Sequence, residues 1–132
     1  MTSHETWDYI IESYNGYGSE ETKTIYKSFC DLVVKQIASS NYSNYLFASQ
    51  SHSYLIISKN QAWPERIQEA FICVDPQGKG RQGSIELLEP QKGGGPRICY
   101  FKIECLNEEM WNHLEPLLKQ LVEIKNSPVE KK

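Results

Sequence analysis

The chain has 132 residues, of which 39% are hydrophobic and 23% are charged, and its net charge at pH 7 is −3. This length and composition predict one folded domain with an ordinary hydrophobic core, and they exclude a disordered or membrane-embedded chain. The net negative charge gives the chain no general attraction to anionic lipid or nucleic acid. We therefore expect no membrane partner, and a nucleic-acid partner is not expected either. The first residues carry no targeting pattern, which predicts a cytoplasmic location.

The four cysteines, Cys30, Cys73, Cys99 and Cys105, lack the close spacing that lets one turn present two thiolates to a metal ion. Cys99 and Cys105 lie on one predicted strand and would be roughly 20 Å apart. We therefore expect reduced thiols that pack as small apolar groups, no metal site and no cofactor.

The N-terminal third predicts two helices. Residues 1–18 are ambiguous between a helix and a strand; we interpret them as a short helix followed by a turn at residues 15–18. A long helix is expected to begin at Ser19. Its apolar stripe follows helical spacing and consists of Ile25, Phe29, Leu32, Val33 and Ile37.

The middle of the chain has the two-residue period of strands. Residues 45–48 and 54–57 predict an antiparallel hairpin, because the link between them is too short for a parallel crossover. Residues 60–70 predict a short helix with Pro64 near its start. Further strands are expected at 71–74, 85–88 and 97–106, the last two preceded by glycine-rich loops.

The hydrophobic period changes from two to 3.6 at Asn107. The following stripe, which must be covered, consists of Met110, Leu114, Leu117, Leu118, Leu121 and Val122. Asn107 is a favourable N-cap, and Glu108 and Glu109 complement the helix dipole. The sequence therefore predicts a strand that runs directly into a C-terminal helix.

Together these elements predict an α+β fold, with a mainly antiparallel sheet of about five strands packed by an N-terminal and a C-terminal helix. We expect a single domain over residues 1–126 and a frayed tail at 127–132. The element order resembles that of profilin-like and roadblock-type modules and of small acidic secretion chaperones. The resemblance covers element order and no motif, so it implies the fold alone.

The predicted strands carry apolar residues on both faces of the sheet, but the two long helices can cover only one face. We expect one face of the sheet to pack on the helices through residues such as Phe71, Cys73, Ile85 and Leu87. The other face would be apolar at its centre and charged at its rim, as protein interfaces are. This predicts a partner-binding surface, and a homodimer interface, formed by Ile72, Val74, Ile98, Tyr100, Lys102 and Glu104.

An equally weighted alternative is that residues 1–18, with Trp7, Tyr9, Ile10 and Ile11, fold across this second face and close a monomeric core. Tyr14, Tyr17, Tyr42 and Tyr45 offer a further protein-binding hypothesis, because exposed tyrosines are frequent in binding sites. Their simpler interpretation is that amphipathic rings fill the edges of helices and strands.

The loops 78–83 and 92–97 combine glycines with cations and suggest an alternative function, the binding of a small anionic ligand or a nucleic-acid backbone. The candidate residues are Lys79, Arg81, Lys92 and Arg97. Both loops are predicted to connect strand to strand, whereas phosphate-binding loops of the well-known kinds precede a helix. We therefore favour flexible hairpin loops.

No arrangement of residues predicts catalysis. His4, His52 and His113 have no nucleophile and acid at informative positions, and Glu86 with Glu104 is better interpreted as part of an ion pair with Lys102. An enzyme is thus the least favoured class, with no catalytic residue proposed. The favoured class is a non-enzymatic protein-binding module, such as an adaptor, chaperone or inhibitor.

Overall fold

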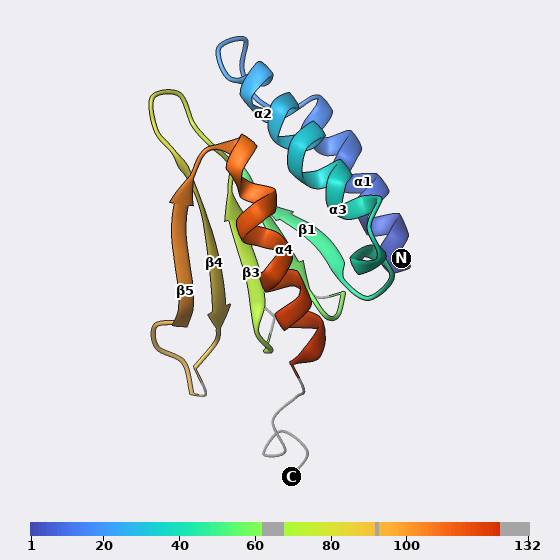
Figure 1. Cartoon of the computed structure of the whole chain (residues 1–132), viewed down its shortest axis with the longest axis vertical. Coiled ribbons are helices and arrows are strands. Elements are labelled where there is room, and N and C mark those ends of the chain that lie inside the picture. Colours follow the sequence, from blue (N-terminus) through green and yellow to red (C-terminus); the bar gives the residue numbers. More distant parts are fainter. Residues whose placement is uncertain (62–67, 92, 125–132) are drawn as a thin grey trace.

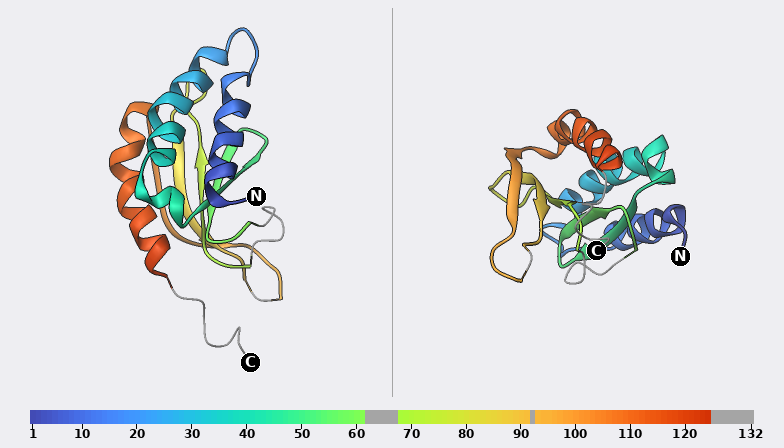
Figure 2. Two further views of the ribbon diagram at one scale, coloured as in Figure 1. Left: turned by 90° about the vertical axis from the view of Figure 1, so that its right-hand side faces the viewer. Right: turned by 90° about the horizontal axis from the view of Figure 1, so that it is seen from below.

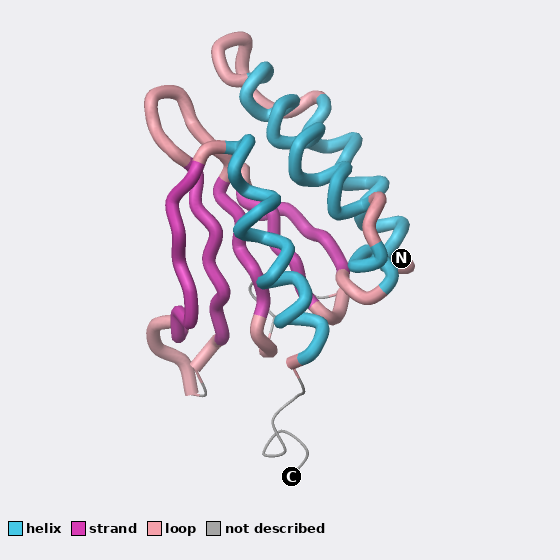
Figure 3. Tube along the Cα trace, in the orientation of Figure 1, coloured by secondary structure: helices cyan, strands magenta, loops and turns pink. Residues whose placement is uncertain are grey.

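A computed structural model describes residues 1–61, 68–91 and 93–124. Five antiparallel strands form one sheet in the order β1-β2-β3-β4-β5, and helices precede and follow it, which confirms the predicted α+β fold (Figures 1 and 3). The strands are β1 (Phe47–Ser51), β2 (Tyr54–Ser58), β3 (Phe71–Asp75), β4 (Gly83–Glu89) and β5 (Ile98–Cys105). Most of the predicted helix at 60–70 and the tail at 127–132 lie outside the described residues.

The helices are α1 (Ser3–Asn15), a continuous run of α2 (Lys23–Phe29), η1 (Cys30–Val34) and α3 (Lys35–Ala38), a short 3₁₀ turn η2 (Asn41–Asn44), and α4 (Asn107–Glu123). The α2–α3 run and α4 lie on one face of the sheet, and α1 lies beside β1 (Figures 1 and 2). None of the helices within the described ranges is long and apolar enough to cross a membrane.

Helix α1 begins with a capping box, in which the Glu5 amide donates to Thr2 Oγ1 (3.2 Å) and the Thr2 amide donates to Glu5 Oε1 (2.7 Å). The hydrogen bond from the Thr2 amide lowers the pKa of the Glu5 carboxyl. Four side chains on the inner side of α1 are buried: Thr6, Trp7, Ile10 and Tyr14. The predicted N-terminal helix is therefore confirmed, and it contributes to the main core.

The long helix contains a π turn, marked by the Lys35 amide donating to the Cys30 carbonyl. A π turn holds an extra residue, so it rotates the side chains that follow relative to those before it. Val34 is fully buried as a result, whereas Leu32, which the sequence places on the apolar stripe, is 41% exposed. The prediction for Leu32 is wrong because a regular 3.6-residue period was assumed.

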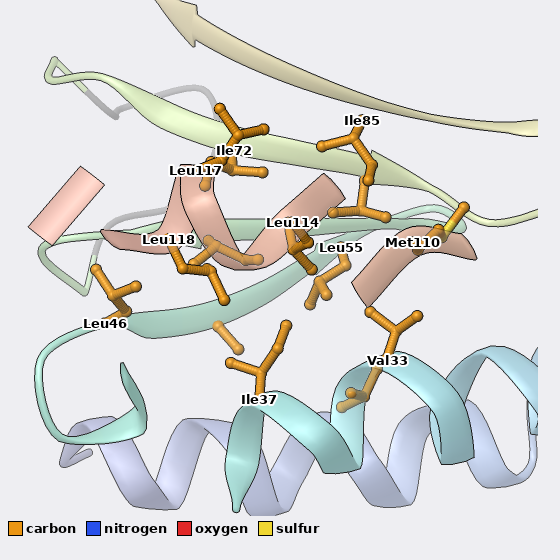
Figure 4. Packing of buried hydrophobic residues seen from close by; sticks show 14 of the residues in the cluster. Val33, Ile37, Leu46, Leu55, Ile72, Ile85, Met110, Leu114, Leu117 and Leu118 are labelled. Carbon is orange, nitrogen blue, oxygen red and sulfur yellow. The ribbon is translucent and has the colours of Figure 1, made fainter. Parts of the chain in front are cut away.

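The main core lies between the sheet and the helices. Val33 and Ile37 approach it from the long helix, and Leu114 and Leu118 approach it from α4 (Figure 4). The inner side chains of the central strands meet them, namely Leu55, Ile57, Ile72, Val74, Ile85 and Leu87. Through this packing α4 covers β3 and β4, the strands with which it makes its main sheet contacts.

The predicted faces of β3 are reversed. Ile72 pairs with Leu87 and Val74 pairs with Ile85, so all four share the inner face, and Ile72 and Val74 are fully buried. Phe71 and Cys73, predicted to face the helices, lie on the opposite face. Because β3 is apolar on both sides, its alternation cannot reveal which side faces inward, and a shift of one residue exchanges the faces.

Asn107 joins three segments at the start of α4. Its Oδ1 accepts from the Gln77 amide (3.0 Å), its amide donates to Gln77 Oε1 (3.1 Å), and its Nδ2 donates to the Ile25 carbonyl (3.3 Å). Leu106 occupies the N-cap position instead, so the predicted capping role of Asn107 is wrong. The buried amide connects α4 to the β3–β4 loop and to α2.

We expect Asn107→Ala to lower the free energy of unfolding by about 1–3 kcal/mol, because it leaves the partly buried Gln77 amide and the Ile25 carbonyl without these partners. Urea denaturation followed by far-UV circular dichroism measures the change. Asn112→Ala, at an exposed position of the same helix, is the matched control. Equal unfolding midpoints for the two variants would contradict this role for Asn107.

Candidate functional site

Strand β5 forms an open edge of the sheet. It has eight residues and pairs only with β4, so the backbone groups on its other side have no strand to pair with in the described part of the chain. Six of its eight residues are exposed. Figure 3 shows β5 at the margin of the sheet, beyond the area covered by α4. Such an edge is a template for another strand.

Apolar side chains follow this open edge. Ile98 and Phe101 are each 37% exposed, Tyr100 is 57% exposed, and Leu106, between β5 and α4, is 39% exposed. Phe101 pairs with Leu87 on the helix side of the sheet, yet α4 leaves it partly uncovered. Exposed apolar side chains gathered along one strand, with the half-buried Ile103 among them, are characteristic of an interaction surface. We call Ile98, Tyr100, Phe101, Ile103 and Leu106 the β5 surface.

A bulge separates the two ends of β5. Leu87 pairs with Phe101 and Leu88 pairs with Cys99, so Tyr100 is the additional residue. The Tyr100 hydroxyl lies 3.4 Å from Glu89 Oε1. Because the bulge interrupts the alternation, the side chains of residues 98 and 99 exchange the faces that a regular strand would give them.

Charged side chains occupy the opposite face of β5. The register places Lys102 opposite Glu86 and Glu104 opposite Ser84. Glu86 and Glu104 are therefore not directly opposite each other, and the expected ion pair with Lys102 is not formed although Lys102 lies opposite Glu86. Within the ranges that the structure describes, Lys102 and Glu104 form no ion pair, and both are exposed. Each is available to a charge on another chain.

The six residues predicted to bind a partner are divided by the structure into two groups. Ile98, Tyr100, Lys102 and Glu104 lie together on β5, and all four are exposed. Ile72 and Val74 have no exposed surface and belong to the core, so they cannot contact a partner. The candidate surface is thereby moved from the centre of the sheet to its edge.

The second face of the sheet differs from both predicted arrangements. Ile56, Phe71 and Leu88 form a small cluster there and are at most 8% exposed. The Arg97 guanidinium carbon lies 5.2 Å from the centre of the Phe71 ring. Helix α1 does not cover this cluster, because its buried side chains belong to the main core. The prediction that residues 1–18 close the second face is therefore wrong.

The opposite edge of the sheet is occupied by α1. The Ala48 amide of β1 donates to Thr6 Oγ1 (3.0 Å), and Trp7 Nε1 donates to the Leu46 carbonyl (2.9 Å). These helix side chains satisfy backbone groups that an open edge would expose. Strand β1 is therefore covered where β5 is open.

A groove of about 580 Å³ lies where α1 meets β1. Tyr9, Ile10 and Ala48 contribute to its lining, and Ser49 Oγ is buried beside it without a hydrogen-bond partner in the described structure. The groove holds no histidine–nucleophile–acid arrangement: its lining includes His52, but no cysteine or carboxylate appears among the described lining residues.

The cations of the predicted anion site are separated and partly neutralised. Arg81 donates through Nη1 and Nη2 to the Asp75 carboxylate (3.1 and 3.3 Å), and Lys79 Nζ lies 3.2 Å from Glu21 Oε2. Arg97 stacks on Phe71 at the other end of β4. Lys92 lies outside the described residues. The structure does not bring Arg81 and Arg97 together.

The histidines and the acids in the described part of the chain form no recognisable catalytic group. His4 Nδ1 lies 3.5 Å from Ser43 Oγ, but that hydroxyl donates to the Ser40 carbonyl and Ser43 is 1% exposed. No cluster of three or more metal-ligating side chains occurs in the described ranges. The geometry around these residues therefore gives no support to a hydrolytic or metal-dependent reaction.

Of the four tyrosines suggested as a binding cluster, Tyr14 is in the main core and Tyr17 and Tyr42 pack against it. Tyr14 is fully buried, its hydroxyl donates to the Ser53 carbonyl (2.7 Å), and burial raises the pKa of this phenol. Tyr17 and Tyr26 pack edge to face 4.8 Å apart beside it. Tyr45 is 62% exposed, but it lies before β1 and away from β5. The predicted tyrosine cluster is not a single surface.

Comparisons with protein-family models, with curated proteins and with solved structures found no match. The interpretation of β5 as the site consequently depends on its geometry. Sequence reasoning missed Phe101 because it assigned the odd-numbered residues of β5 to a covered face, and it missed Leu106 because it expected that side chain to pack on Trp111 of α4. One signal was available: Leu106 alone connects β5 to α4, so the helix has to lie near the end of the last strand.

Thiol reactivity tests the exposure of β5. Burial raises the pKa of Cys73 to about 12 and of Cys105 to about 11, and it also raises the pKa of Cys30, so at pH 8 these thiols contain very little thiolate. Cys99 is exposed. At low micromolar concentration we expect one thiol per chain to react rapidly with a disulfide reagent, and Cys99→Ser to abolish that phase. Two rapid thiols would contradict the burial of the others.

Proposed function

We propose that this chain is a non-enzymatic protein-binding module that acts as a homodimer, in which the β5 strands of two copies pair. The observation that supports this most directly is the uncovered edge of β5, together with the exposed apolar side chains along it. Backbone hydrogen bonds would supply affinity, and the side chains of the β5 surface would supply specificity. A role as adaptor, chaperone or inhibitor is compatible with such a module.

A second copy suits this edge for a geometric reason. Two antiparallel edge strands pair about a two-fold axis perpendicular to the sheet, which keeps the helices of both copies on the same side. The partly uncovered Phe101 side chains then lie on one continuous face, beside the two α4 helices. Pairing would satisfy the open backbone and bury apolar area in a single contact.

The alternative function, binding of a small anion or a nucleic-acid backbone through loops 78–83 and 92–97, has weaker support. Arg81 and Lys79 already contact carboxylates. A phosphate would have to compete with Asp75 and Glu21, and the acidic net charge would oppose its approach. A cytoplasmic location remains a prediction from the sequence.

The oligomeric state tests the proposal. In reducing buffer, size-exclusion chromatography with light scattering should give twice the mass of one chain at high micromolar concentration. Tyr100→Asp should weaken association by at least about tenfold, because a charge would be buried beside the apolar contact. Tyr45→Asp changes an equally exposed tyrosine outside β5 and should leave the mass unchanged. A wild-type monomer at these concentrations would end the proposal.

The paired substitution Lys79→Glu and Arg81→Glu separates the two functions. The dimer should persist, because both residues lie in the β3–β4 loop and outside the β5 surface. Fluorescence anisotropy with a labelled single-stranded oligonucleotide should show no binding by the wild-type chain at physiological salt. Salt-sensitive binding by the wild type that this variant loses would instead favour the anion-binding function.

A further inference from the structure

We infer that the two β5 strands pair with the two-fold axis at Ile103, so that Lys102 of each copy faces Glu104 of the other. This inference rests on the proposed function and specifies the register of the interface. When two copies of one strand pair antiparallel about a two-fold axis, the numbers of directly opposite residues always add up to the same sum. Directly opposite side chains lie on the same face of the sheet, whereas neighbours along a strand lie on opposite faces. The axis must therefore lie at a residue that is opposite its own copy, and it cannot lie between two residues. The possible registers of β5 are therefore few.

The charges of β5 select among these registers. An axis at Lys102 places two ammonium groups opposite each other, and an axis at Glu104 places two carboxylates opposite each other, which is destabilising in both cases. An axis at Phe101 places Lys102 opposite Tyr100 and Glu104 opposite Ile98, without charge compensation. With the axis at Ile103, each Lys102 faces a Glu104. Both side chains are exposed and lack ion pairs in the described structure.

The same register continues the charge pattern of the sheet. Lys102 is already opposite Glu86 on β4, and the second copy would place Glu104 on its other side. Lys102 would thus lie between two carboxylates along one row of the extended sheet. On the helix face, Phe101 would lie opposite Cys105, and the two Ile103 residues would lie opposite each other.

The same register also pairs exposed apolar side chains at the two ends of the contact. Tyr100 falls opposite Leu106 of the second copy, and both are among the exposed large hydrophobic residues. Pairing cannot extend beyond Leu106, because Asn107 begins α4. The ladder would therefore run from residue 100 to residue 106 in each copy, which is a normal length for a strand pair.

Charge exchange tests the contact. All variants carry Glu86→Gln, so that the residue at 102 faces no carboxylate within its own chain. In this background Lys102→Glu should weaken dimerisation by roughly tenfold or more, since two attractions become two repulsions. Adding Glu104→Lys should restore the dissociation constant to within about threefold of the background. Sedimentation equilibrium at physiological salt measures all three constants, and circular dichroism confirms folding.

Disulfide trapping provides an independent measurement of the register. In a Cys99→Ser background, Ile103→Cys should form an intermolecular disulfide under mild oxidation, because directly opposite Cβ atoms come close enough for a bridge. Lys102→Cys is the matched control. With the axis at Ile103 its two copies are diagonal neighbours, roughly 7–8 Å apart, and should cross-link much more slowly.

The outcomes separate the register from the dimer. Failure of the Glu104→Lys exchange to restore association, or faster trapping at 102 than at 103 while the wild-type chain remains a dimer, overturns the register and leaves the proposed function standing. A wild-type chain that remains a monomer at high micromolar concentration overturns both. Restoration together with preferential trapping at 103 supports the inference.

Discussion

The structure depends on a mismatch between the width of the sheet and the width of the helical layer. The long helix and α4 pack side by side over the inner face, and α4 makes its main sheet contacts with β3 and β4, whereas on β5 Cys105 is buried in the core and Ile103 is half-buried against it. Helices pack about 8–10 Å apart whereas strands lie about 4.8 Å apart, so two helices cover about four strands. The fifth strand is therefore left partly uncovered, and its exposed Phe101 is a direct consequence.

The two edges of the sheet differ in whether side chains of a helix form hydrogen bonds with their backbone groups. At β1, Thr6 and Trp7 of α1 supply hydrogen bonds to backbone groups of Ala48 and Leu46. At β5, a bulge and two charged residues are the devices that limit indiscriminate association. The contrast gives β5 a special position, because it is the edge at which pairing remains possible.

Much of the fold could be predicted from the sequence because its hydrophobic periods are clear. The change of period at Asn107 located the junction of β5 and α4, and the alternation in 97–106 identified the longest strand. The faces of β3 could not be predicted, since Ile72 and Phe71 are both apolar and only the register with Leu87 decides between them. The π turn at Cys30 likewise has no signature in the period before it.

Only part of the candidate site could be predicted, because some of its residues are recognisable from one strand alone and others depend on the packing of the helices. Tyr100, Lys102 and Glu104 were recognised because they interrupt an apolar pattern with polar groups, which is a local property of one strand. The exposure of Phe101 depends on where α4 ends its coverage, which is a property of the whole helical layer. Spacing within a strand carries no information about the width of the layer above it.

The covered edge at β1 also determines what kind of assembly β5 can form. A sheet with two open edges can add copies at both and grow into a fibre, whereas a sheet with one open edge is complete after a single pairing. In the proposed assembly, helix α1, whose Thr6 Oγ1 accepts from the Ala48 amide, would therefore block the second site of growth at β1. Helix α1 thus completes the core through Trp7 and Ile10, and in the proposed homodimer it would also restrict association through β5 to a closed pair.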